Sequence, residues 1–250
     1  MAKQRHLTNA PLAEALLDIQ VIQKQGLTVS DLGPMESALE GKYKRRGVKR
    51  QGGFQVNLDM QSESSEGIAK TRSSPIGYMY SDLSEKKLLQ VSLGAFTQNV
   101  LKPYSSFEDL VAEAKENWAR YVEVTRPIAI SRVALRYIND LRLPATGEPF
   151  EDFLTASPMV PSELPQTVSD FASRVTIDNH RLGMKAIVNQ LFQGVIDDRG
   201  IQVILDIDAI SEGQLDASDA RLWDCVAQLR QFKNDIFFSF VTDRLLERYQ

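Results

Sequence analysis

The sequence predicts an α+β fold with one long antiparallel sheet, saddle-like in shape, and all helices on one face. Several stretches alternate apolar and polar residues with the period of two that half-buried strands show, and two long stretches repeat apolar residues with the helical period. The predicted elements follow the order β-α-β-β-β-α in each half of the chain. We therefore expect one domain over residues 1–250, built from two pseudo-repeats at about 8–126 and 127–250.

Four strands are expected in the first half. At 13–22, Ala15, Leu17 and Ile19 belong to an apolar set that alternates with Glu14, Leu16, Asp18 and Gln20, which predicts a strand with one buried face. The stretch FQVNLDMQ at 54–61 shows the same alternation. The segments 76–82 and 87–96 predict two more strands, and the polar segment 62–75 predicts a loop.

The first expected helix follows the opening strand. Thr28 or Ser30 can cap its N-terminus, and the glycine-rich basic stretch from Gly41 would end it. Its apolar positions, at helical spacing, are Leu32, Met35, Leu39 and Tyr43.

A second helix is expected after residue 105. Ser105 with Glu108 reads as a capping box, and Trp118 lies on the apolar stripe of the stretch that follows. We expect Trp118 to be buried between this helix and the sheet.

The second half repeats the order of elements. A strand is expected at 129–140, a short helix around 148–156, and a helical tail over about 218–248. Three further strands are expected between them, at 171–179, 183–193 and 200–208.

Composition limits the possible partners. The net charge is −4, and six of the 29 Lys and Arg residues fall within residues 42–50, leaving 23 against 33 acidic residues elsewhere. An acidic surface repels polyanions, so nucleic-acid binding could only be local. Cys225 is the only cysteine, which excludes an intramolecular disulfide and fits a reducing compartment. We predict a cytoplasmic protein with no membrane span, because no apolar run approaches the ~18 residues of a spanning helix.

The basic segment, residues 42–50, has two interpretations. Cations beyond a helix C-terminus interact favourably with its exposed carbonyls, which would make the segment a solvated helix end. Alternatively, it binds an anionic partner, a nucleic acid or a protein. Its cations are Lys42, Lys44, Arg45, Arg46, Lys49 and Arg50.

The sheet face without helices, which we call the open face, is expected to be polar and of mixed charge. Its expected side chains are Glu14, Asp18, Gln20, Gln55, Asn57, Asp59, Arg132, Arg136, Arg174, Thr176, Asp178 and Asp206. The face is either an internal lattice of ion pairs or a site for a polar ligand. The candidate ligand-binding residues are Glu14, Asp18, Arg132, Arg136, Asn139 and Arg174.

A specific pairing is expected on this face. If the first strands of the two halves are antiparallel neighbours, one register places Glu14 opposite Arg136 and Asp18 opposite Arg132. That pairing would support a pseudo-two-fold relation between the halves.

Signatures of catalysis and of metal binding are few. The sequence contains no phosphate-binding glycine loop, HExxH, GxSxG or CxxC pattern. The acidic residues between Asp197 and Glu212 do not have the spacing of a calcium-binding loop. We therefore expect no catalytic residues, no metal and no cofactor.

Three stretches carry a family resemblance: NAPLAEALLDIQV at 9–21, the segment around RVALRYIN at 132–139, and LDID at 205–208 with the C-terminal helix. Together they resemble a sporadically distributed, functionally uncharacterised bacterial family of about this length. The most specific part of the resemblance is Arg136, Tyr137 and Asn139. The sequence departs from that family at two places: Ala134 stands where the family often has Gly, and the family often has a His near the position of Phe232. The resemblance implies a single unit and no particular chemistry.

These observations lead to three functional hypotheses. The leading one is a non-enzymatic binding protein that recognises another bacterial protein, as an accessory or neutralising component of a defence or toxin-type system. The alternatives are nucleic-acid binding through the basic segment and an enzyme with a polar site on the open face. A homodimer is also possible.

Overall fold

The computed structural model describes residues 5–55, 70–144, 147–196 and 200–250. These residues form an α+β fold with one antiparallel sheet of nine strands in the order β2-β3-β4-β5-β1-β6-β9-β8-β7, so the predicted class is confirmed. The strands are β1 (Leu12–Ile22), β2 (Tyr43–Gln55), β3 (Lys70–Asp82), β4 (Lys87–Ser92), β5 (Ala95–Leu101), β6 (Ala129–Leu143), β7 (Ala172–Asn179), β8 (Met184–Val195) and β9 (Ile201–Leu215). The α-helices are α1 (Pro34–Ala38), α2 (Phe107–Thr125), α3 (Arg221–Phe240) and α4 (Asp243–Leu246), and the short 3-10 helices are η1 (Val29–Leu32), η2 (Phe150–Asp152) and η4 (Glu247–Tyr249).

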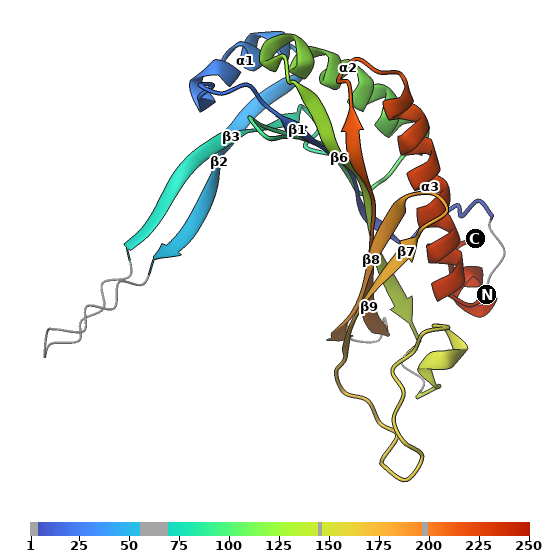
Figure 1. The fold of residues 1–250 in the computed structure, drawn as a ribbon. Coiled ribbons are helices and arrows are strands. Elements are labelled where there is room, and N and C mark those ends of the chain that lie inside the picture. Colours follow the sequence, from blue (N-terminus) through green and yellow to red (C-terminus); the bar gives the residue numbers. More distant parts are fainter. Residues whose placement is uncertain (1–4, 56–69, 145–146, 197–199) are drawn as a thin grey trace, which may run out of the picture.

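The helices lie along one face of the curved sheet, and the opposite face stays open (Figure 1). The core fills the space between the two layers: Leu17 of β1, Leu135 of β6 and Ile207 of β9 are fully buried there. Trp118 of α2 is 4% exposed, and its indole N–H donates to the carbonyl of Ala217 at 3.1 Å. The expected burial of Trp118 is confirmed. No helix in the described parts of the chain has both the length and the apolar character needed to cross a membrane.

The centre of the sheet is the antiparallel pair β1 and β6, the first strands of the two halves. Their expected adjacency is confirmed, but the expected register is wrong by two residues, because Leu16 pairs with Arg136 and Asp18 with Ala134. Faces are preserved by a shift of two, since side chains alternate with a period of two. Alternation in the sequence could therefore predict the faces but not the register.

The predicted helix over residues 28–43 is wrong in its second part. Thr28 begins the short turn η1 and α1 ends at Ala38, after which Gly41 at φ +83° redirects the chain into β2. Tyr43 is buried from the strand and not from a helix, and its hydroxyl donates to Glu113 at 3.0 Å. The basic segment is therefore part of a strand and not a helix end.

Other boundaries in the first half also differ. Residues 70–75, predicted as loop, belong to β3, and the predicted strand at 87–96 is two strands, β4 and β5. The first half thus has one strand more than predicted. Only Phe54 and Gln55 of the predicted strand 54–61 are described, within β2; Asn57 and Asp59 lie outside the described residues. The N-cap of α2 is Ser106, whose hydroxyl accepts from the Asp109 amide at 3.0 Å, one residue later than predicted.

Candidate functional site

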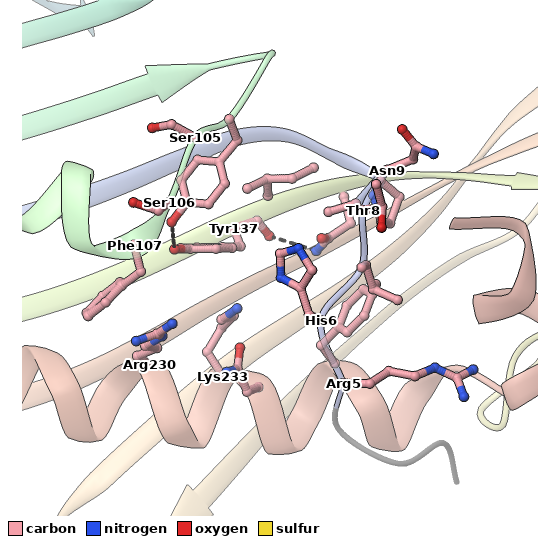
Figure 2. Close-up of a pocket in the computed structure, with 18 of the residues that line it drawn as sticks. Arg5, His6, Thr8, Asn9, Ser105, Ser106, Phe107, Tyr137, Arg230 and Lys233 are labelled. Carbon is pink, nitrogen blue, oxygen red and sulfur yellow. Dashed lines mark hydrogen bonds between the residues drawn. The ribbon is translucent and has the colours of Figure 1, made fainter. Parts of the chain in front are cut away.

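A cavity of about 620 Å³ lies between the N-terminal segment 5–12, the start of α2, strand β6 and helix α3 (Figure 2). We call it the lysine pocket. Its volume lies within the range of small-molecule sites, roughly 300–1,000 Å³. The residues that carry its chemistry are His6, Tyr104, Phe107, Tyr137, Arg230 and Lys233.

Two tyrosines form one wall of the lysine pocket. Tyr137 points to the helix side of β6 because side chains alternate along the strand, and Tyr104 lies in the connection from β5 to α2. Their hydroxyls are 2.6 Å apart and hydrogen-bonded, and their rings meet edge to face. Burial raises the pKa of Tyr137 to about 12 and raises that of Tyr104 further. Both hydroxyls are therefore protonated near neutral pH.

Helix α3 supplies the two cations of the opposite wall. Arg230 and Lys233 are three residues apart, which places them next to each other on one face of the helix. Arg230 lies 4.3 Å from the centre of the Phe107 ring and donates to Glu108 at 2.7 Å. Arg230 is thus fixed in place by a ring and a carboxylate.

Lys233 is buried and has no acidic partner. Only 7% of the residue is exposed, its ammonium nitrogen lies 3.8 Å from the centre of the Tyr137 ring, and no carboxylate in the described chain forms an ion pair with it. Burial, together with the charge of Arg230, lowers the pKa of Lys233 to about 7. A buried lysine is ordinarily paired, so this unpaired one marks a candidate site.

The charge of the lysine pocket is opposite to that of the whole protein. Among its lining residues Glu108 is the only acid, and it is already bound to Arg230. The basic lining residues are Arg5, His6, Lys102, Arg230 and Lys233. Since the walls also contain aromatic rings, the cavity suits a molecule with an anionic group and an apolar body.

The open face contains a second polar cluster, a lattice of ion pairs. Arg136 binds both carboxylate oxygens of Asp206, at 2.7 and 2.8 Å, and Asn189 donates to the same carboxylate at 3.1 Å. Arg132 lies between two carboxylates, Asp18 at 2.9 Å and Asp208 at 3.2 Å. These groups satisfy one another and need no ligand for their hydrogen bonds.

Four of the candidate ligand-binding residues lie together in or beside this lattice. Asp18 contacts Arg132 as expected, but Glu14 accepts a hydrogen bond from Asn99 and forms no ion pair with Arg136 within the described chain. Arg174 lies apart, exposed on β7 opposite Asn189. The sixth candidate, Asn139, lies elsewhere.

Asn139 does not lie on the open face. It is three residues after Arg136 on β6, so its side chain points to the helix side. There it donates to the carbonyl of Leu205 at 3.0 Å and lines the lysine pocket. Its expected position on the open face is wrong because an odd spacing along a strand changes the face.

Several cations of the basic segment have internal partners. Lys42 contacts Glu116 at 2.6 Å, Arg45 contacts Glu36 at 3.0 Å, and Arg46 contacts Glu85. The other three cations lie on β2, where their main chain runs opposite β3: Lys44 lies opposite Ser81, Lys49 opposite Gly77 and Arg50 opposite Pro75. At least three of the six charges, those of Lys42, Arg45 and Arg46, are thus compensated within the protein.

Sequence analysis missed the lysine pocket. Its walls come from four segments far apart in the chain, so no local pattern describes it. One signal was present: Lys233 occupies an apolar position of α3, between the buried residues Phe232 and Ile236. A cation in such a position is either paired or functional.

Among the described residues, no group of three or more His, Cys, Asp or Glu side chains is arranged to hold a metal ion.

Comparison with known proteins adds no family to this description. The sequence matches no protein-family model, and no curated protein is significantly similar to it.

Proposed function

We propose that this protein is a binding protein that captures a small anionic molecule in the lysine pocket. The observation that carries the proposal is Lys233, an unpaired and buried cation that borders a cavity of about 620 Å³. The proposal keeps the expectation of a binding protein and changes the location of the site, from the open face to the helix side of the sheet.

The energetic reason is the missing counter-charge. Burying an ammonium group without a partner is costly, and the low pKa of Lys233 expresses that cost. An anionic ligand would supply the partner, and charge-assisted hydrogen bonds are stronger than neutral ones. The aromatic rings of Phe107 and Tyr137 would contact the apolar part of the ligand.

The test compares two probes of the same shape, benzoate and benzamide, by titration calorimetry. The proposal predicts that benzoate binds and that benzamide binds at least about tenfold more weakly, which corresponds to about 1.4 kcal/mol. Lys233→Met should reduce the preference for benzoate, because one of the two cations that α3 supplies is lost. Lys185→Met is the matched control, because Lys185 pairs with Glu212 outside the pocket. Equal binding of the two probes would contradict the proposal.

A second candidate function is recognition of another protein, as the sequence suggested. Strand β7 is one of the two edge strands of the described sheet, and most of its residues are exposed on both faces, including Val175 at 44%. An edge strand of this kind can pair with an extended segment of a partner. We propose a bacterial partner protein, with the defence or toxin-type setting as a further prediction.

Site-specific photo-crosslinking in the source cells tests this second candidate. A crosslinking residue in place of Val175 should capture a protein that the same residue in place of Ser37 does not, because Ser37 is exposed on α1, far from β7 along the sheet. The same adducts from both positions, or none, would contradict partner pairing at β7.

We also propose that the fold is an internal duplication with a saddle-like sheet. The support is the strand order: β1 and β6 are central, each is followed outward by the last strand of its own half, β5 or β9, and then by β4 or β8.

A cytoplasmic location is likewise proposed, supported by the single cysteine. The nucleic-acid alternative has less support, because Lys42, Arg45 and Arg46 already have carboxylate partners.

A further inference from the structure

In the described chain, the amine of Lys233 has no polar partner, in contrast to several other polar groups that line the lysine pocket. Tyr104 and Tyr137 bond to each other, Arg230 bonds to Glu108, and Asn139 bonds to a main-chain carbonyl. Within the described residues, Lys233 makes no hydrogen bond or ion pair, and its nitrogen lies over the Tyr137 ring. Figure 2 shows its side chain rising from α3 into the cavity between Arg230 and His6.

An amine in such surroundings is suited to nucleophilic attack. Lysine becomes reactive when its neutral form is populated, and enzymes achieve this by burying it in an apolar site or by placing it next to another cation. Lys233 has both conditions, with 7% exposure and Arg230 one turn away on the same helix face. Its pKa of about 7 is consistent with this geometry.

We infer that Lys233 forms a covalent imine with small anionic aldehydes and ketones, 2-oxo acids among them, whose anionic group Arg230 holds. The inference rests on the proposed function and deepens it by naming the chemical class of the ligand. Arg230 has donors beyond the nitrogen that bonds Glu108, so it can bind a carboxylate while keeping that contact. A ligand held by Arg230 in this cavity can then present its carbonyl group to the amine of Lys233.

The reaction balances without an oxidant or reductant. The neutral amine of Lys233 attacks the carbonyl carbon and forms the C–N bond of a carbinolamine. The former carbonyl oxygen takes up the two protons that the nitrogen loses and leaves as water, which gives the C=N bond. The hydroxyls of Tyr104 and Tyr137 lie in the same pocket and stay protonated, so they can pass a proton to the leaving oxygen.

The experiment traps the imine with 4-carboxybenzaldehyde, an anionic aldehyde with the shape of the benzoate probe. Sodium cyanoborohydride transfers hydride to the imine carbon and converts it to a stable secondary amine. Peptide mapping by mass spectrometry then locates the adduct. Near pH 7 we expect Lys233 to be modified at least about tenfold faster than Lys185, which is paired with Glu212, because a large share of the Lys233 amine is neutral at that pH.

Two variants separate the covalent step from binding. Lys233→Arg keeps the cation, so it should still bind benzoate but form no adduct at position 233. Arg230→Gln should slow the modification of Lys233 by 4-carboxybenzaldehyde and change its modification by uncharged benzaldehyde much less. If benzoate binds while Lys233 is modified no faster than Lys185, the inference is overturned and the proposed function stands. If benzoate does not bind either, both are overturned.

Discussion

The ammonium nitrogen of Lys233 lies 3.8 Å from the centre of the Tyr137 ring, and this contact takes the place of a carboxylate partner. A cation over an aromatic face is stabilised by up to about 2 kcal/mol when desolvated. That is less than the cost of burial, since the pKa of Lys233 falls from 10.5 to about 7, a change of about 5 kcal/mol in the balance between its two protonation states. Below neutral pH, Lys233 is therefore charged, and its charge lowers the stability of the folded protein.

Stability should depend on pH through this lysine. Its folded-state pKa, about 7, is below the unfolded value, so between pH 7 and 10 the unfolded chain binds more protons than the folded one. Stability from this group therefore rises with pH in that window and is lowest below pH 7. Lys233→Met should stabilise the protein near pH 6 by about 3 kcal/mol, after allowance for the lost ring contact, and by less near pH 9.

Urea denaturation at the two pH values measures this effect. Lys185→Met is the control, and because Lys185 forms an exposed pair with Glu212, it should change the unfolding free energy by less than about 1 kcal/mol. A Lys233→Met protein that is less stable than the wild type near pH 6 would show that the buried ammonium has a partner.

Benzoate affinity should fall as pH rises. The pocket binds the anion best when Lys233 is protonated, so the Kd should increase above pH 7, by up to about tenfold per pH unit. The other titratable and charged groups lining the cavity are Arg5, His6, Lys102, Tyr104, Glu108, Tyr137 and Arg230. His6 is the imidazole among them, so His6→Gln serves as a second variant.

Calorimetry from pH 6 to pH 8.5 checks this dependence in three proteins. His6→Gln should keep the trend, and Lys233→Arg should lose it, because the guanidinium stays charged throughout. A trend that disappears in His6→Gln and persists in Lys233→Arg would assign the titration to His6.

The sequence could predict the faces of the sheet much better than its contacts. Alternation placed Asp18, Arg132 and Arg136 on the open face, but the same alternation is compatible with registers that differ by two residues. As a result, Arg136 pairs with Asp206 of β9 and not with Glu14. Choosing between carboxylates requires the positions of neighbouring strands, which depend on the packing of the whole sheet.

The basic segment shows a different limit of sequence reasoning. Tyr43 continues the helical spacing of Leu32, Met35 and Leu39, yet it is buried from β2. A short run of apolar residues fits either structure, and the turn at Gly41 decides between them. Longer strands in which the alternation continues over many residues, such as β1, have less of this ambiguity.

The pair of Arg136 and Asp206 should matter for stability. Asp206 is 5% exposed, so Arg136→Met leaves a buried carboxylate whose remaining side-chain partner, in the part of the chain that the structure describes, is Asn189; this should cost about 3 kcal/mol. Arg174→Met, on the exposed edge strand, should cost less than about 0.5 kcal/mol. Urea denaturation at pH 7 gives both values. Equal, small losses would mean that Asp206 keeps enough water to remain charged without Arg136.

Gly77 of β3 lies where the paired strand β4 leaves no room for a side chain. It pairs with Ser92, and a Cβ at position 77 would lie 2.0 Å from the carbonyl oxygen of Val91 and 2.8 Å from Cα of Ser92. These are main-chain atoms of a paired strand, so they cannot move aside without breaking ladder hydrogen bonds. Gly77→Ala should therefore destabilise the protein by ~3 kcal/mol or more.

The matched control is Gly47→Ala in the adjacent strand β2. A Cβ at Gly47 meets nothing within 4 Å, so that substitution should change stability by less than about 1 kcal/mol. Both variants are compared by thermal and urea denaturation, with benzoate binding as a second readout. Because Gly77 lies in the first half of the sheet and the lysine pocket beside α3, the folded fraction of Gly77→Ala should bind benzoate normally. Unchanged stability in Gly77→Ala would mean that β3 and β4 are farther apart than the structure places them.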